Sequence, residues 1–330
     1  MLPPPPGTTA DRVPLGVADL RVTRLCYGTS KLFRLHSSRE RQRLLESAFD
    51  AGIRHFDTAR SYGLGDAERE VGVFASRHRG EITVGSKFGL QVTQAGRWFK
   101  PMQQIGRRVV GLLPGLRKRI IRPASALVGP SRFDLPTARM SLEKSLRTLN
   151  LPCIDILFLH EPTMASGVTG ALSDFLVTAR DRGEIRTWGL SGPLPNILPV
   201  KNAFPSLAPV LQYECSAVLR PGLPRVEGPQ ITYAPFASAL DAIAERLSQS
   251  STAAAAWRRD INLPTDRHTI AGLLLANALH QPTVHPVVFS TTRVDHLHTL
   301  VAAAYDPDQH QRVLPLRTWI GEHFLSPNPS

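Results

Sequence analysis

Short apolar segments alternate with longer amphipathic segments along most of this chain. The apolar segments have the length of strands and predict buried strands at 21–28, 53–56, 82–87, 154–160, 185–191, 210–213, 231–233 and 287–289. Apolar residues between them recur at helical spacing, which predicts helices at 39–51, 67–76, 135–149, 171–182, 197–203, 239–248, 269–280 and 294–304. This regular alternation with short connections requires a parallel sheet that is either closed or doubly wound.

The beginning of the alternating pattern carries recognisable boundary signals. Residues 13–27 predict a short hairpin that leads into the first parallel strand, Ser38 suits an N-cap of the first helix, and Gly52 ends that helix. The chain has 330 residues, and barrels of alternating strands and helices commonly exceed about 250 residues as one unit. We therefore predict an α/β fold, a (β/α)8 TIM barrel with a short N-terminal β-hairpin, as one domain over 11–330.

The composition of the chain indicates where this domain functions in the cell and which kinds of site it can hold. Residues 1–10 are rich in proline and lack the basic region and apolar core of a secretory signal, so we expect a disordered tail there. No window approaches the ~18 uninterrupted apolar residues of a membrane span. Cys26, Cys153 and Cys215 are scattered, which argues against a disulfide framework or a zinc site. We expect a cytoplasmic protein without a metal.

The net charge of +12 is concentrated in one segment. Nine lysines and arginines and no acidic residue lie between 91 and 133, where Pro114-Gly115 interrupts an apolar stripe of helical spacing. This basic insertion is interpreted as a cover over the active-site mouth that packs on its own domain. The alternative is contact with an anionic membrane surface. Nucleic acid is not an expected partner, because a recognition motif and a set of base-stacking aromatics are missing.

Four polar residues come at or just after the ends of predicted strands, namely Asp57, Tyr62, Lys87 and His160. The carboxyl ends of parallel barrel strands converge on one face, so these side chains are expected to form one site. A phenol beside an ammonium group can donate a proton more readily, since the cation favours the phenolate. Asp57 would hold Lys87 in an ion pair, and His160 would bond to a substrate oxygen.

The sequence around these residues resembles the aldo-keto reductases from about residue 22 to about residue 304. The specific part is Phe56-Asp57-Thr58-Ala59 followed by Ser61-Tyr62-Gly63-Leu64-Gly65-Asp66-Ala67-Glu68. The resemblance implies NAD(P)-dependent hydride transfer, without a metal, between nicotinamide and an aldehyde or ketone, or the matching alcohol or lactol. It also implies that Tyr62 is the general acid/base.

The same resemblance implies a set of cofactor residues. These are Gly28, Thr29, Asp57, Ser191, Gln212, Tyr233, Ser290, Thr291 and Arg293. The planar guanidinium of Arg293 suits a phosphate, which slightly favours NADP over NAD. Two positions depart from the family pattern: Gly192 follows Ser191 where the family has Asn, and Thr299-Leu300 stands where Glu-Asn is usual. These departures keep open an alternative function, a nucleotide-binding sensor or regulatory barrel with little turnover.

Overall fold

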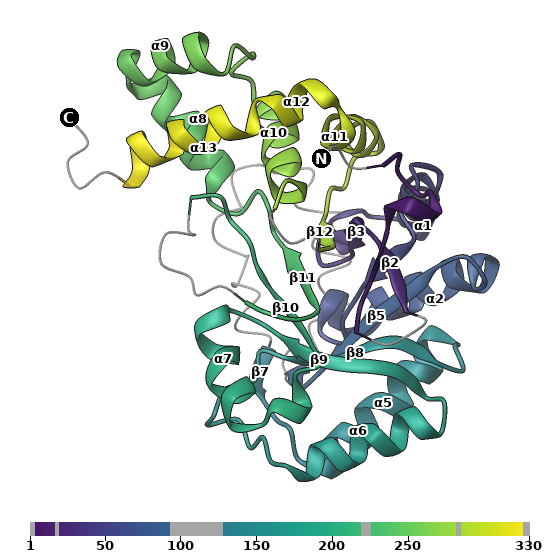
Figure 1. Cartoon of the computed structure of the whole chain (residues 1–330). Coiled ribbons are helices and arrows are strands. Elements are labelled where there is room, and N and C mark those ends of the chain that lie inside the picture. Colours follow the sequence, from purple (N-terminus) through teal and green to yellow (C-terminus); the bar gives the residue numbers. More distant parts are fainter. Residues whose placement is uncertain (1–3, 17–19, 93–127, 219–225, 282–284, 326–330) are drawn as a thin grey trace, which may run out of the picture.

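Eight parallel strands close into a barrel with the order β10-β11-β12-β3-β4-β5-β8-β9. The computed structural model describes residues 4–16, 20–92, 128–218, 226–281 and 285–325 (Figure 1). The barrel strands are β3 (Leu25–Gly28), β4 (His55–Asp57), β5 (Thr83–Phe88), β8 (Ile154–His160), β9 (Ile185–Ser191), β10 (Val210–Glu214), β11 (Gln230–Tyr233) and β12 (Val287–Phe289). The predicted barrel is therefore confirmed.

Successive residues of each strand face opposite sides of the barrel wall. Within β8, Ile156 and Phe158 belong to the buried cluster inside the barrel, whereas Leu157 and Leu159 belong to the cluster beneath the outer helices. The inner cluster also takes residues from the N-terminal segment, namely Leu15, Leu20 and Val22. This segment closes the amino end of the barrel and leaves the carboxyl end of the strands for the site.

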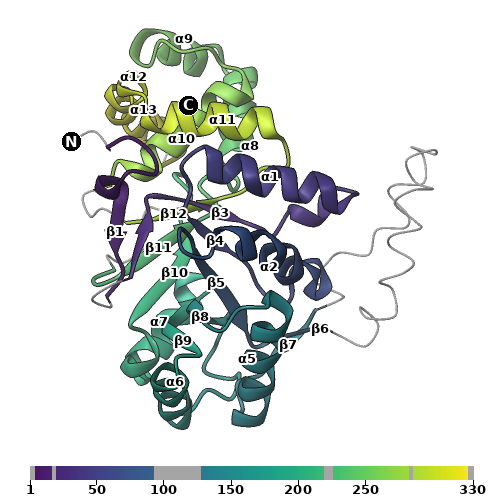
Figure 2. The same ribbon diagram turned by 90° about the vertical axis from the view of Figure 1, so that its right-hand side faces the viewer.

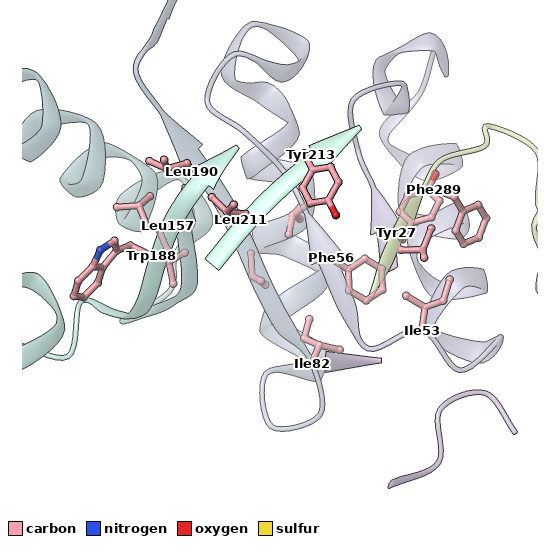
Figure 3. Close-up of a cluster of buried hydrophobic side chains, with 14 of the residues drawn as sticks. Tyr27, Ile53, Phe56, Ile82, Leu157, Trp188, Leu190, Leu211, Tyr213 and Phe289 are labelled. Atoms are coloured by element: carbon pink, nitrogen blue, oxygen red, sulfur yellow. The ribbon is translucent and has the colours of Figure 1, made fainter. Parts of the chain in front are cut away.

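The amphipathic segments form helices against the outside of the barrel (Figure 2). They are α1 (Ser38–Asp50), α2 (Asp66–His78), α5 (Leu135–Leu149), α6 (Ala171–Asp181), α7 (Leu194–Ala203) and α11 (Val294–Tyr305). Figure 3 shows part of the apolar layer under them, where side chains from several strands meet, among them Phe56, Leu157 and Leu211. The N-cap of α1 is Ser37, which forms a capping box with Glu40, so the assignment of the cap to Ser38 was wrong by one residue.

A further group of helices lies to one side of the barrel (Figure 1). It consists of α8 (Ala239–Gln249), α9 (Ser251–Asp260), α10 (Arg267–Leu279), α12 (Pro307–Gln311), α13 (Val313–Ile320) and a π-helix (Gly321–Leu325). This group has its own buried cluster, in which the Trp257 and Trp319 rings meet edge to face at 5.3 Å. The sequence pattern did not predict α9, α12 and α13.

The predicted N-terminal hairpin is present as β1 (Arg12–Pro14) paired antiparallel with β2 (Arg21–Thr23). Residues 4–10, part of the tail expected to be disordered, instead form a turn that leads into a 3-10 helix, Thr9–Asp11. The Gly7 amide donates to Asp11 Oδ2 at 3.2 Å, and the Tyr305 hydroxyl donates to Asp11 Oδ1 at 2.8 Å. Asp11 thus links this N-terminal turn to α11.

Two short strands border the basic insertion. β6 (Leu90–Val92) pairs antiparallel with β7 (Val128–Ser131), while residues 93–127 lie outside the described part of the chain. The predictions of a cover and of membrane contact fall on those residues. Among the helices that the structure describes, none is long and apolar enough to cross a membrane. Other short helices connect the elements, namely the 3-10 helices Leu32–Arg34, Tyr62–Gly65 and Pro205–Leu207.

Candidate active site

Polar side chains gather at the carboxyl end of the barrel because each occupies an inward-facing position at the end of its strand. His160, for example, has the same parity as Ile156 and Phe158, which are inside the barrel. By the same alternation other strands direct a polar residue to this end, namely Asp57 from β4, Lys87 from β5, Ser191 from β9, Gln212 from β10 and Tyr233 from β11. Together they line one cavity.

Asp57 and Lys87 form a buried ion pair on neighbouring strands. Lys87 Nζ bonds to Asp57 Oδ2 and also donates to the Thr58 carbonyl at 3.2 Å. Both side chains are almost fully buried, with 2% of Lys87 and 5% of Asp57 exposed. Burial lowers the pKa of Lys87, and the Asp57 carboxylate opposes this change. The pair therefore places a positive charge in the wall of the cavity, with its counter-charge beside it.

The ion pair continues into a hydrogen-bonded chain. Gln212 Nε2 donates to Asp57 Oδ1 at 2.9 Å, and Ser191 Oγ donates to Gln212 Oε1 at 2.6 Å. These bonds fix the orientation of the Gln212 amide, because its nitrogen must face Asp57 and its oxygen must face Ser191. The residues implied for catalysis and those implied for cofactor binding thus belong to one connected set.

Tyr62 reaches the cavity from a tight turn after β4. The turn is the 3-10 helix Tyr62–Gly65, in which Gly63 has a φ of 57° and a Cβ at that position would lie 2.5 Å from the Phe33 ring. Only glycine fits such a position without displacing its neighbour. The Tyr62 ring meets the His160 ring edge to face at 5.8 Å, and Lys87 Nζ is 5.3 Å from the Tyr62 ring centre.

Burial dominates the titration of Tyr62 and His160. Burial raises the pKa of Tyr62 well above 10, and the nearby Asp57, Tyr233 and Glu161 raise it further. Burial also lowers the pKa of His160 well below 6.5, and the charge of Lys87 acts in the same direction. Burial thus opposes the shift toward the phenolate that is expected from the charge of Lys87. Both side chains are therefore neutral near pH 7.

The cavity has a volume of about 220 Å³ and is bordered by most of the predicted site residues. All four predicted catalytic side chains line it, as do Gly28, Ser191, Gln212, Tyr233 and Ser290 of the predicted cofactor set. In the described part of the chain, no group of three or more His, Cys, Asp or Glu side chains could hold a metal ion. The structure thus brings residues from the carboxyl ends of all eight barrel strands, and from the turn that carries Tyr62, to one place.

Three predicted cofactor residues do not line this cavity. Thr29 is buried, and its hydroxyl donates to the Asp57 carbonyl at 3.1 Å. The carbonyl of Thr291 accepts from the Tyr27 hydroxyl at 2.6 Å. The exposed guanidinium of Arg293 forms an ion pair with Asp295. None of these three residues is part of the cavity wall.

Other residues of the cavity wall had not been recognised in the sequence. They include Ser30, Lys31, Glu161, Phe236 and Phe289. Glu161 directly follows His160, so its place after an inward-facing strand end was a usable signal. Phe236 belongs to the loop after β11, and no periodic pattern marks the residues of such a loop.

The sequence of this chain is similar to those of known oxidoreductases. Residues 24–198 match the model of the aldo/keto reductase family. The chain is 32% identical over 187 residues to a D-threo-aldose 1-dehydrogenase of a Pseudomonas species, which covers 55% of this chain and 53% of that protein. It is 30% identical over 152 residues to a pyridoxal 4-dehydrogenase of Microbacterium luteolum, and this match covers 44% of this chain and 42% of that protein. The chain thus spans about half the length of these relatives.

The fold is also similar to that of a solved aldo-keto reductase. The holo form of an aldo-keto reductase from Bacillus halodurans superposes with a TM-score of 0.64 at 19% identity, over 93% of this chain and 96% of that one. At 19% identity the superposition supports only the barrel fold. The family match, in contrast, covers more than half of the sequence and includes the segments that carry Asp57, Tyr62, Lys87 and His160. This chain belongs to the aldo/keto reductase family.

Proposed function

We propose that this chain is an NAD(P)-dependent oxidoreductase that acts on an aldehyde or ketone, or on the matching alcohol or lactol. The observation that carries the proposal is the placement of Tyr62 beside His160 and Lys87 at the wall of one cavity. The two relatives described above are named as dehydrogenases of an aldose and of pyridoxal, which supports a carbonyl or lactol substrate.

The cavity wall suits a nicotinamide ring. Ser191 and Gln212 offer a hydroxyl and an amide to a carboxamide, and the Tyr233 ring provides a flat face against which an aromatic ring can pack. When bound, the cofactor supplies or accepts the hydride. Gly192 has no side chain, so Ser191 and Gln212 would hold the carboxamide without the Asn that the family pattern places between them in sequence.

Tyr62 would act as the general acid in reduction. With a raised pKa it keeps its proton at neutral pH, and an alkoxide that forms beside it is a stronger base than a phenolate. The proton therefore passes from the Tyr62 hydroxyl to the new alkoxide oxygen. In oxidation Tyr62 must first release its proton to solvent, so that the phenolate oxygen can take the proton of the alcohol, and the positive charge of Lys87 favours that phenolate.

The other three residues would support this proton transfer. Neutral His160 can donate a hydrogen bond to the substrate oxygen, which orients the carbonyl toward Tyr62. Lys87 places a positive charge 5.3 Å from the centre of the Tyr62 ring, and Asp57 holds that charge in position. The Gln212 bond restrains Asp57 from the opposite side.

The choice between NAD and NADP depends on Arg293 in this proposal. A 2′-phosphate would have to compete with Asp295, which already pairs with the Arg293 guanidinium. Since the carboxylate also repels a phosphate, the slight preference for NADP expected from Arg293 is weakened. Replacing Asp295 with Asn should tighten NADPH binding more than NADH binding.

A fluorescence titration with NADH and NADPH, followed by turnover assays with aldoses and simple aldehydes, tests the proposal. Saturable binding of one cofactor together with turnover would support the oxidoreductase. Binding without turnover on any carbonyl or lactol would favour the sensor barrel instead. Failure of both cofactors to bind the folded protein would contradict both functions.

A further inference from the structure

A carboxylate outside the predicted catalytic and cofactor sets lies at the wall of the cavity. Glu161 directly follows His160 at the end of β8, and its exposed side chain borders the same cavity as Tyr62 and Tyr233. Glu161 has a φ of 53°, which few residues other than glycine, Asn and Asp adopt. Such a conformation persists only where neighbouring contacts hold it. Here the Glu161 amide donates to the Ser191 carbonyl at 2.6 Å.

Gly192 provides the space beside this carboxylate. A Cβ at position 192 would lie 3.1 Å from Glu161 Cα, 3.3 Å from Ile197 Cγ2 and 3.5 Å from Glu161 Cγ. Contacts of 3.1 to 3.3 Å are tighter than carbon atoms prefer, so a larger residue would press on the Glu161 backbone and on the Ile197 side chain. The glycine that replaces the usual Asn is therefore matched to the position of Glu161.

The carboxylate is free to bind a ligand. Within the described part of the chain, no hydrogen bond or ion pair engages the Glu161 side chain. Its charge nevertheless acts on the site: after burial and Asp57, Glu161 and Tyr233 contribute to the raised pKa of Tyr62. The positive charge of Lys87 is already paired with Asp57, and Lys31 follows β3, three strands away around the barrel.

We propose that Glu161 selects a neutral polyhydroxylated substrate, an aldose in its lactol form, and excludes anionic ones. An ionised carboxylate only accepts hydrogen bonds, so the ligand group that faces it must donate. A lactol offers ring hydroxyls next to its reactive carbon, where they can face Glu161 while the anomeric hydroxyl faces Tyr62. The cavity of about 220 Å³ fits a small substrate, and Phe236 offers an apolar face to its C–H groups.

This inference rests on the proposed function, and it predicts opposite changes in KM for neutral and anionic substrates. Glu161→Gln keeps the size of the side chain and removes its charge. For a neutral aldose the KM should rise roughly tenfold with kcat little changed, because hydrogen bonds to charged groups are stronger than those to neutral ones. For the corresponding uronate, which carries a carboxylate, the KM should instead fall. Glu143→Gln removes an exposed charge on α5 and should change neither value.

The opposite directions of the two KM changes distinguish a role of Glu161 in recognition from a structural defect in the variant. A structural defect would weaken both substrates, so a parallel loss with aldose and uronate would overturn the role of Glu161. Calorimetric titration of the neutral aldose into the parent and the Glu161→Gln protein gives a second measure that needs no turnover. Weaker aldose binding by the variant supports the inference even if no substrate is oxidised, whereas equal binding overturns it. Absence of turnover with every substrate would count against the proposed function alone.

Discussion

The side-chain amide of Gln212 donates a hydrogen bond to Asp57 Oδ1 at 2.9 Å, although 155 positions separate the two residues in sequence. Asp57 in turn pairs with Lys87, and Gln212 accepts from Ser191. The proposed nicotinamide site and the proposed proton-transfer site therefore share a carboxylate. A substitution at Gln212 should therefore affect both cofactor binding and proton transfer.

Gln212→Leu removes the bond to Asp57 and the acceptor for Ser191 while keeping the volume similar. The buried Asp57 oxygen then lacks one donor, which costs on the order of 1–3 kcal/mol. We expect a lower free energy of unfolding and a weaker Kd for NADH, measured by denaturant titration and fluorescence. Gln212→Glu should be worse, because it places a second carboxylate beside Asp57. Normal cofactor binding by Gln212→Leu would remove Gln212 from the nicotinamide site.

The Asp57–Lys87 pair allows a double-mutant test. Lys87→Met or Asp57→Asn alone leaves one buried charge without its partner and should cost about 3–5 kcal/mol of stability. The double variant has neither charge, so its loss should be clearly smaller than the sum of the two. All three variants should lose turnover. Additive losses of stability would show that the two side chains do not interact across the site in solution.

A buried histidine beneath the site predicts a pH dependence of stability. Burial lowers the pKa of His55 to about 4, and its Nδ1 lies 2.8 Å from the Thr83 hydroxyl. The folded protein therefore favours neutral His55, and this contribution is lost as the pH falls from about 6.5 toward 4. At pH 5 the cost is about 2 kcal/mol relative to pH 7.

Comparison with His55→Gln isolates this effect from other titrating groups. The drop in unfolding free energy between pH 7 and pH 5 should be smaller in the variant by about that amount. Denaturant titrations of both proteins at the two pH values give the difference. Equal drops would mean that His55 does not titrate with a lowered pKa.

The basic insertion can be tested through its borders. Val92 on β6 is paired with Val128 on β7, so the two ends of the intervening segment are adjacent. Replacing 93–127 with an Asn-Gly turn should leave a folded barrel that still binds the cofactor, since such turns join antiparallel strands. We expect an altered substrate range and, if the membrane alternative holds, weaker binding to anionic vesicles at low salt. Insoluble protein would show that the segment belongs to the core.

The sequence predicted the barrel and nine of the residues that line the cavity, because both follow from local patterns. Strands β8 and β9 and helix α5 have the predicted bounds, and the polar residues at the strand ends share the parity of the interior residues. Helices α9, α12 and α13 were missed: α9 and α13 pack on each other around Trp257 and Trp319, and α12 packs against α10 and α11, so none of them follows the barrel pattern. Hydrophobic periodicity does not identify such a second layer.

Electrostatic properties were harder to predict for a different reason. The pKa of Tyr62 depends on how completely the fold removes it from water, and the sequence gives only its neighbours. The pairing of Arg293 with Asp295 and the space that Gly192 leaves for Glu161 are likewise properties of side-chain positions in three dimensions. A motif indicates which residues meet, but it does not give their burial or partners.

The most direct measurement of the central claim is the turnover of Tyr62→Phe. The substitution removes only the hydroxyl that is proposed to donate the proton, and a positioned acid contributes roughly 10²- to 10⁴-fold in rate. We predict a loss of kcat in that range on a substrate that the parent protein turns over, with the Kd for NADH and the unfolding free energy nearly unchanged. Near-normal kcat in a cofactor-saturated Tyr62→Phe protein would contradict the assignment of Tyr62 as the general acid/base.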